Sequence, residues 1–269
     1  MSARAIVVTA GKGGVGKTTT TANLAVALAQ RGNKVVAVDA DIGLRNLDLV
    51  MGLESRVVYN FIDVIEKRCK LGQALVHDKR MRDHLYLMPT AQTRTKDAVT
   101  PEQMRELCDQ MREQFDFILL DCPAGIEGGF KNAAAGADEA LVVTTPEIPA
   151  VRDADRIIGM LDSMGKSPTQ LIINRYRPAM VQGGEMLSPD DILDLLAVKL
   201  IGIVPEDDSV IKASNRGEPL TFKRDSPAGE AYSNIAARIL GEDVPMLSMD
   251  VRSGRGFIDA LKAFLGFGA

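Results

Sequence analysis

The stretch Gly11-Lys12-Gly13-Gly14-Val15-Gly16-Lys17-Thr18 decides the fold of this 269-residue chain. It fits the pattern G-x-x-x-x-G-K-[ST], in which backbone N–H groups of a glycine-rich loop close around phosphate oxygens. An apolar run rich in β-branched residues (5–9) precedes it, and a segment with helical periodicity (18–30) follows it. The pattern therefore has the strand–loop–helix context of a phosphate-binding loop, and it predicts binding of a nucleoside triphosphate.

The rest of the chain continues the alternation of strands and helices. Further strand-like runs lie at residues 34–39, 85–88, 115–121, 140–144, 170–174 and 200–204. Segments with helical periodicity lie at 101–114, 150–163, 189–198 and 228–240. Alternation of this kind predicts an α/β fold with a mostly parallel, doubly wound sheet and helices on both faces. The length suits one such domain, which we place at residues 1–241.

Composition limits the classes of partner. The net charge is −4, so no basic surface for a polyanion stands out and we expect no specific nucleic-acid partner. The three cysteines, Cys69, Cys108 and Cys122, lack C-x-x-C spacing and are interpreted as reduced thiols. The N-terminal residues show no secretory signal and no apolar stretch is long enough to cross a membrane, so we expect a cytoplasmic protein whose membrane contact is peripheral.

The residue types of the loop fit a nucleotide bound with Mg²⁺. Lys17 can reach the β- and γ-phosphates, and Thr18 can ligate the metal ion. The backbone expected to surround the phosphates belongs to Gly13, Gly14, Val15, Gly16, Lys17, Thr18 and Thr19. Lys12 is an additional cation on the same loop, for which a solvated surface lysine is the simplest explanation.

Carboxylates follow two of the predicted strands, at the sheet edge where ligands of α/β proteins bind. Asp121 ends the run 117–120 in the manner of a Walker B aspartate, suited to holding Mg²⁺ through its water shell. Asp39 and Asp41 follow the strand at 34–39, where they could also merely cap the next turn. The segment Asp121-Cys-Pro-Ala-Gly125 looks like a switch turn that would respond to a γ-phosphate, because Gly125 permits close approach of the backbone to that phosphate.

These features resemble the ParA/MinD family of ATPases with a deviant Walker A loop, and longer stretches resemble the MinD branch of that family. The stretches are Asp41-Ile-Gly-Leu-Arg-Asn-Leu-Asp-Leu-Val-Met-Gly52, Arg56-Val-Val-Tyr-Asn-Phe61, Gln73-Ala-Leu, Asp78-Lys-Arg80, Gln92-Thr-Arg94, Pro123-Ala-Gly-Ile-Glu127, Val151-Arg-Asp-Ala-Asp-Arg156, Val204-Pro-Glu-Asp207 and Ala213-Ser-Asn-Arg-Gly-Glu-Pro219. The resemblance covers nearly the whole chain.

The resemblance implies roles for residues that the pattern alone leaves open. Lys12 would cross a dimer interface to the nucleotide of the second subunit, which makes a homodimer dependent on ATP. Asp41 would place the attacking water, and Asp39 would belong to the surroundings of the metal ion. Adenine would be held at two further strand ends by Asn174, Arg175, Pro205 and Asp207. A helix cap or a loop contact remains the alternative for Asn174 and Asp207.

The resemblance also implies a cellular function, namely positioning of the division site through recruitment of a MinC-like division inhibitor to the membrane. Hydrolysis would be slow until a partner stimulates it. The surface that regulators share would include Arg152, Asp153 and Asp155, although exposed charges on a helix usually mean only solvation. The stretch Thr145-Pro-Glu-Ile-Pro-Ala150 departs from an Asn followed by small serines in the family, so the regulator, MinE-like or another, stays open.

The C-terminal segment has one apolar stripe. Its members are Phe257, Ile258, Leu261, Phe264 and Leu265. A polar stretch (242–256) separates them from the domain, so the segment reads as a tether and a short amphipathic helix (257–267). A helix docked on its own domain is the ordinary interpretation. The resemblance favours a helix that binds phospholipid at the inner face of the cell membrane.

Other members of the same wider family are alternatives. A ParA-type DNA-partition ATPase is disfavoured by the acidic charge and the amphipathic tail. A relative of the nitrogenase iron protein would need cysteines placed symmetrically at a dimer interface, and only Cys122 adjoins the predicted switch. A flagellar-number ATPase related to MinD typically carries an N-terminal extension, whereas here the first strand begins almost at once.

Overall fold

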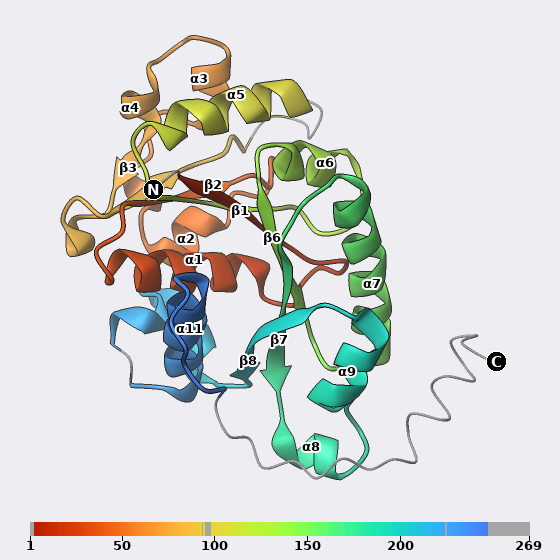
Figure 1. The fold of residues 1–269 in the computed structure, drawn as a ribbon. Helices are drawn as coiled ribbons and strands as arrows, with labels where there is room; N and C mark the ends of the chain where they lie inside the picture. Colours follow the sequence, from red (N-terminus) through yellow and green to blue (C-terminus); the bar gives the residue numbers. More distant parts are fainter. Residues whose placement is uncertain (1–2, 93, 95–97, 224, 247–269) are drawn as a thin grey trace.

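Eight strands form one sheet in the computed structural model, which describes residues 3–92, 94, 98–223 and 225–246 (Figure 1). The strands are β1 (Arg4–Thr9), β2 (Val35–Asp39), β3 (Val76–His77), β4 (Leu85–Met88), β5 (Phe117–Asp121), β6 (Glu139–Thr144), β7 (Thr169–Tyr176) and β8 (Lys199–Pro205). Their order is β3-β4-β2-β5-β1-β6-β7-β8, and only the β3–β4 pair is antiparallel among them. The chain thus winds outward from β1 in both directions, as predicted.

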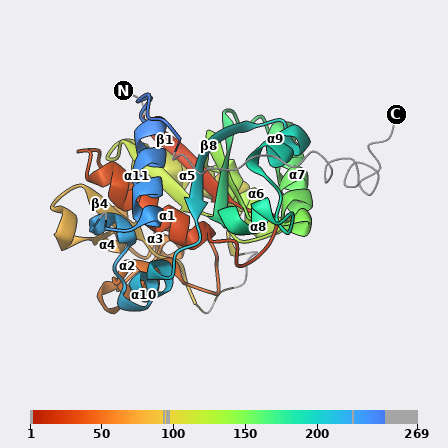
Figure 2. The same cartoon turned by 90° about the horizontal axis from the view of Figure 1, so that it is seen from below.

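Helices cover both faces of this sheet (Figures 1 and 2). They are α1 (Lys17–Ala29), α2 (Leu47–Met51), α3 (Phe61–Ile65), α4 (Leu71–Ala74), α5 (Pro101–Arg112), α6 (Gly128–Ala135), α7 (Ile148–Ser163), α8 (Pro178–Gln182), α9 (Pro189–Leu196), α10 (Ser209–Arg216) and α11 (Pro227–Ile239), with short 3-10 turns η1 (Glu54–Arg56), η2 (Lys79–Met81) and η4 (Leu220–Phe222). One core contains side chains of α3, α5, α6, α7 and α9, and the other contains side chains of α1, α2 and α11.

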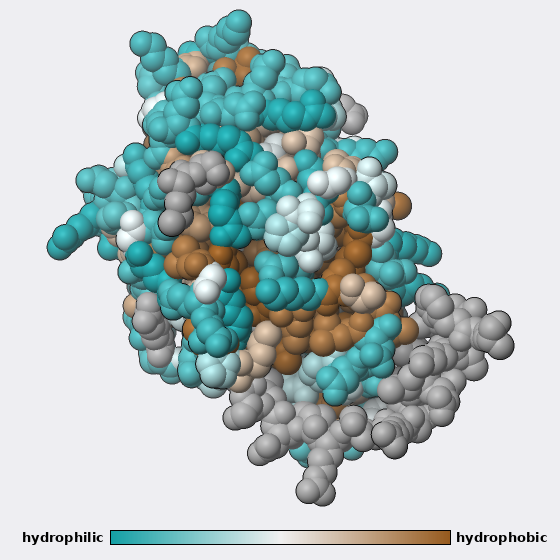
Figure 3. All heavy atoms as spheres, viewed as in Figure 1, coloured by the Kyte–Doolittle hydropathy of each residue, from teal (hydrophilic) through white to brown (hydrophobic). Residues whose placement is uncertain are grey.

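The central strand explains why both faces are covered. In β1, Ala5 and Val7 belong to the first core, whereas Ile6 and Val8 belong to the second. Successive side chains of a strand point to opposite faces, so a continuous apolar run requires packing on both. On the face shown in Figure 3, apolar surface lies over β6 to β8, between α11 and α9, and hydrophilic surface lies over α3 to α5.

All seven predicted strands are present, and so are the five helices predicted for the domain. The eighth strand, β3, has two residues and carries no periodicity that could predict it. Helix α7 begins at Ile148, two residues before the predicted start, because Pro149 suits the first turn of a helix. The predicted amphipathic helix at 257–267, and the predicted tether from residue 247 onward, lie outside the described residues. Within the described part, no helix has the length and apolar character of a membrane span.

Candidate nucleotide-binding site

The loop between β1 and α1 forms a cradle of backbone N–H groups. Gly14 and Gly16 have φ of +78° and +102°, a region that residues with a side chain rarely adopt. Gly16 is also the residue that precedes α1, and no side chain of the described residues caps this helix. The first N–H groups of α1 therefore point toward the loop with their partial positive charge available to an anion.

Two neighbouring segments hold this loop in place. A Cβ atom on Gly11 would lie 2.3 Å from the carbonyl oxygen of Asp153, so only glycine allows α7 to approach this closely. On the other side, Nδ2 of the buried Asn174 donates a 2.7 Å hydrogen bond to the carbonyl oxygen of Val15. These two contacts hold the loop in its observed conformation.

The two lysines of the loop differ in environment. Lys17 is only 8% exposed, at the start of α1, whereas Lys12 is exposed at the tip of the loop with Gly13 and Gly14. A buried lysine without a full partner is costly, and phosphate oxygens are the partner that this position suits.

The predicted metal-site carboxylates lie next to each other in the sheet. Asp39 and Asp121 are register partners at the ends of β2 and β5, and both are buried. Asp39 accepts hydrogen bonds of 3.1 Å from the backbone N–H groups of Leu47 and Asp41. Burial raises the pKa of Asp39 to about 7 against those two hydrogen bonds. Burial, and then the charge of Asp39, raises the pKa of Asp121 to about 7.

This donor set fits Mg²⁺. The ion prefers hard oxygen ligands and keeps several waters, so it needs few protein ligands beside the phosphates. The side chain of Thr18 lies near Asp121 and lowers its pKa against the effect of burial, so a hydroxyl and a carboxylate come together at the start of α1. Among the described residues there is no group of three or more His, Cys, Asp or Glu side chains that could form a complete cage. A divalent cation beside Asp121 would offset the cost of its buried charge.

One residue near the metal site was not predicted from the sequence. The hydroxyl of Thr21 lies 3.4 Å from Oδ1 of Asp121 and donates to the carbonyl oxygen of Lys17 at 3.0 Å. It therefore helps to fix Asp121 against α1. The signal in the sequence was the run of four threonines at 18–21, since Thr21 lies one helical turn after Lys17.

The segment after Asp121 approaches the loop as expected for a switch. Gly125 has φ of +88°, and its N–H donates to the carbonyl oxygen of Ala10 at 3.1 Å. The next residue, Ile126, is 47% exposed, and Leu44, three residues after Asp41, is 59% exposed. Both candidate switch segments thus expose a large apolar side chain.

The predicted adenine residues lie at the ends of β7 and β8. Arg175 has φ of +56°, a strained conformation that is often found at functional sites, and its side chain is exposed. Pro205 ends β8 opposite Tyr176. Burial alone would raise the pKa of Asp207, but hydrogen bonds from the Ser209 hydroxyl and backbone N–H outweigh it, and the pKa is lowered. The carboxylate of Asp207 thus already caps the loop that starts α10.

The predicted regulator residues lie on α7. Arg152 and Asp155 are exposed there, and Asp153 is half-buried where its backbone contacts Gly11. A groove of about 590 Å³ runs along α7 beside Asp155 and is closed on its other side by residues 196–198.

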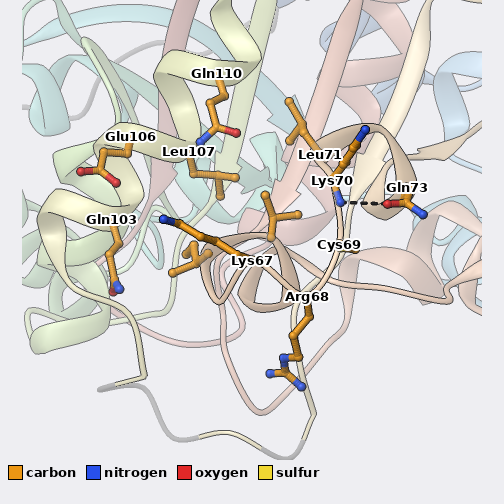
Figure 4. Close-up of a pocket in the computed structure, with 12 residues that line it drawn as sticks. Lys67, Arg68, Cys69, Lys70, Leu71, Gln73, Gln103, Glu106, Leu107 and Gln110 are labelled. Carbon is orange, nitrogen blue, oxygen red and sulfur yellow. Dashed lines mark hydrogen bonds between the residues drawn. The ribbon is translucent and has the colours of Figure 1, made fainter.

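A groove of about 740 Å³ lies elsewhere, between the α3–α4 turn and α5 (Figure 4). Lys67 points across it toward α5, whereas Arg68 points away. None of the predicted site residues lines this groove. The nucleotide site is therefore assigned from the chemistry of the loop and the strand ends, not from the size of a cavity.

Comparison with known proteins agrees with this geometry. Residues 6–220 match the family model of the CobQ/CobB/MinD/ParA nucleotide binding domain. The septum site-determining protein MinD of Bacillus subtilis is 54% identical over 263 residues, which is 97% of this chain and 98% of that protein.

Solved structures show the same likeness. MinD in the MinC:MinD cell division protein complex of Aquifex aeolicus superimposes with a TM-score of 0.85 at 46% identity, covering 91% of this chain and 99% of that one. The septum site-determining protein MinD of Pyrococcus horikoshii, complexed with Mg-ADP, superimposes with a TM-score of 0.78 at 32% identity, covering 88% and 96%. The chain therefore belongs to the MinD family of septum site-determining proteins, within the CobQ/CobB/MinD/ParA nucleotide-binding family.

Proposed function

We propose that this protein is an ATPase that dimerises when ATP is bound, associates with the membrane as a dimer, and positions the division site by recruiting a MinC-like inhibitor. The observation that carries the proposal is the different environment of two lysines on one loop. Lys17 is buried where it can serve the nucleotide of its own subunit, whereas Lys12 is exposed and free to reach a second subunit. Two clustered triphosphates need positive charge from both chains.

The exposed apolar residues of the switch segments favour the same dimer. Leu44 and Ile126 flank the site on the segments that would respond to a γ-phosphate. When ATP orders these segments, a second copy of the chain can cover both side chains. Loss of the γ-phosphate would expose them again and release the dimer.

Each residue then has a role in hydrolysis. Lys17 binds the β- and γ-phosphates, and Lys12 of the other subunit adds charge to the transition state. Asp41 orients the attacking water, since phosphoryl transfer depends mainly on positioning and charge stabilisation. Thr18, Asp39 and Asp121 hold Mg²⁺, which neutralises charge on the phosphates. The adenine of ATP lies against Asn174, Arg175, Pro205 and Asp207. Turnover is slow until a partner completes the site.

Membrane association rests on the C-terminal stripe of five large apolar residues. Burying them contributes roughly 10 kcal/mol, against roughly 1 kcal/mol for each of about ten residues that must be ordered. One helix therefore binds marginally, and two helices on one dimer bind far better through effective concentration. ATP thus controls residence at the inner face of the cell membrane. The tail carries a net charge of only +1, so salt should weaken binding slightly.

The division inhibitor is the partner that the comparisons favour, because the Aquifex aeolicus relative was solved as a MinC:MinD complex. We place the inhibitor on α7, where exposed Asp155 borders a groove of about 590 Å³. The regulator that stimulates hydrolysis, MinE-like or another, would share this surface with Arg152 and Asp153.

The test combines size measurement with sedimentation on liposomes. The full chain is supplied with ATP, ADP or a non-hydrolysable ATP analogue, and we expect a dimer that pellets with liposomes only with the triphosphates. A chain truncated before Gly256 should still dimerise but stay in the supernatant. A monomer under all conditions overturns the proposed dimer. If the truncated chain pellets with liposomes, the proposal that the C-terminal helix binds the membrane is overturned. A steep salt dependence of liposome binding contradicts the proposal that this binding is mainly apolar.

A further inference from the structure

Three sequence motifs that the nucleotide chemistry leaves unexplained meet at Arg80. This residue belongs to the stretch Asp78-Lys79-Arg80 and lies in η2. The other two motifs are residues 41–52, which end with α2 and Gly52, and residues 213–219, which form the last turn of α10 and the residues after it. Their meeting point, which we name the Arg80 junction, comprises Asp78, Arg80, the Met51–Gly52 turn, Gly217 and Phe222.

Arg80 uses nearly all of its donors at this junction. Its Nε and Nη2 bind the carboxylate of the buried Asp78 at 2.9 and 2.6 Å. Nη1 donates to the carbonyl oxygen of Gly217 at 2.9 Å, and Nη2 also donates to the carbonyl oxygen of Met51. Cζ of the guanidinium lies over the Phe222 ring, 4.5 Å from its centroid. Only a planar fork with several fixed donors can make these contacts together.

The ends of α2 and α10 touch each other directly. Gly52 and Gly217 follow these two helices with φ of +66° and +63°. A Cβ atom on Gly217 would lie 2.4 Å from Cα of Gly52, so the two turns are in backbone contact. A shift of one helix end therefore displaces the other.

The same three elements lead back to the nucleotide site. Helix α2 begins at Leu47, whose N–H holds Asp39, and α10 begins at Ser209, whose N–H holds Asp207 at 2.8 Å. The turn η4, which contains Phe222, is fixed to α1 because Thr221 donates from its N–H to Oδ1 and from its hydroxyl to the carbonyl oxygen of Asn23. The junction therefore links Asp39 at the predicted metal site, Asp207 at the predicted adenine site, and helix α1 after the phosphate loop.

We propose that Arg80 is a positioning residue that couples two segments of the nucleotide site through the far ends of α2 and α10. One segment leads from Asp39 to α2, and the other leads from Asp207 to α10. The proposal rests on the nucleotide site proposed above. Binding of Mg²⁺ and ATP would fix Asp39 and the start of α2. The resulting shift of α2 is transmitted through Met51 and Gly217 to α10 and Asp207. Without Arg80, the phosphate and metal part of Mg-ATP and its adenine part bind independently of each other, which lowers the affinity for Mg-ATP.

The test uses the full chain with Arg80→Lys and Arg80→Met. Lysine keeps the charge and the stem but cannot serve Asp78, Met51 and Gly217 together. We expect the Mg²⁺ concentration for half-maximal ATP hydrolysis to rise roughly fivefold or more, and the affinity for a fluorescent ATP analogue to fall by a similar factor. Arg82→Met, an exposed arginine two residues along, is the matched control and should change neither value.

A merely structural Arg80 would give a different result. The variants would then melt at lower temperature, yet well below that temperature their Mg²⁺ requirement and ATP affinity would stay within about twofold of the parent chain, which overturns the coupling. Hydrogen exchange of the unaltered chain provides a test that survives misfolding of the variants. Mg-ATP should slow exchange at both 47–53 and 214–218, and protection of only one segment overturns the proposal. Failure of the nucleotide site itself is distinguishable, because the unaltered chain would then not bind ATP.

Discussion

The site has a phosphate side, with Lys17, Asp39 and Asp121, and a base side, with the predicted adenine residues Asn174 and Asp207. Both lie on the same edge of the sheet, but they differ in the partners of their polar groups. On the phosphate side, Lys17, Asp39 and Asp121 are buried, and the pKa of each carboxyl is raised to about 7. On the base side, Asn174 binds the carbonyl oxygen of Val15, and the pKa of Asp207 is lowered by hydrogen bonds from its own loop. The buried carboxyls of the phosphate side suit a bound cation, whereas the polar groups of the base side are hydrogen-bonded within the protein.

The difference predicts which property each substitution should change. A charge in an unfavourable environment contributes little to the stability of the free protein, so its loss mainly lowers the affinity for the ligand. Groups that are satisfied by the protein's own backbone contribute to the stability of the free protein. Phosphate-side variants should therefore lose ligand before stability, and base-side variants should lose stability even without ligand.

The largest effect is expected for Lys17→Ala. Lys17 is the cation that the loop buries against the phosphates, and charge-assisted hydrogen bonds of this kind contribute about 1.5–3 kcal/mol each. With more than one phosphate oxygen involved, affinity for ATP should fall roughly 100-fold or more. Calorimetric titration with ATP measures this loss.

Lys12→Ala is the matched control for that measurement. It removes the exposed lysine of the same loop, so ATP should still bind the monomer while dimerisation is lost. Equal losses of affinity in the two variants would break the distinction between a buried and an exposed lysine.

Asp41→Ala should separate binding from hydrolysis. Its backbone N–H, which holds Asp39, is kept, so the metal side stays formed. Loss of the group that orients water should lower the hydrolysis rate roughly 100-fold while ATP binding and dimerisation persist. Phosphate release and size measurement on the same sample test both parts. A variant that no longer dimerises would show that Asp41 shapes the switch and does not act on water alone.

The buried carboxyls predict an unusual pH dependence of the free protein. In the unfolded chain Asp121 titrates near 4, whereas in the folded chain its pKa is about 7. Between these values the folded state holds more protons, so the free energy of unfolding falls as pH rises from about 4 to 7 and then levels off. Asp121→Asn should remove the part of this fall that Asp121 contributes, on the order of 4 kcal/mol over the full range.

Urea unfolding at pH 5 and pH 8 measures that slope, with the unaltered chain as the reference. Mg-ATP should flatten it in the unaltered chain, because a cation beside Asp121 stabilises the charged form. Identical slopes with and without Asp121 would show that this carboxylate is no more costly than the satisfied groups of the base side.

The contrast also marks what could be predicted from the sequence. Lys17, Thr18 and Asp121, which the structure places close together, could be selected from the sequence because they occur in local patterns whose spacing is set by the chemistry. The strands around them were predicted for a similar reason, since buried parallel strands are continuous apolar runs. Local pattern and function coincide there.

The remaining contacts depend on residues distant in the chain. Asn174 meets Val15 across 159 residues, and Arg80 meets Gly217 across 137. No spacing rule connects such pairs, so the sequence could place Asn174 at a strand end but could not show which atom its amide would bind. Strand β3 was missed because it is too short to display a period, and so were several helices of eight residues or fewer, namely α2, α3, α4, α6, α8 and α10.

The smallest expected effect tests the base side. Asn174→Ala removes a buried 2.7 Å hydrogen bond and leaves the Val15 carbonyl oxygen without this donor, which should cost about 1–2 kcal/mol of stability in the absence of nucleotide. Asn132→Ala is the matched control, because Nδ2 of Asn132 makes a comparable 2.6 Å bond to the carbonyl oxygen of Val99, in α6 and away from the loop.

Both asparagine variants should unfold at lower urea, but only Asn174→Ala should also weaken ATP binding, since only there does the lost bond hold the loop. If Asn174→Ala lowered ATP affinity with unchanged stability, its amide would serve the ligand alone. The base side would then resemble the phosphate side, and the difference in construction between them would not hold.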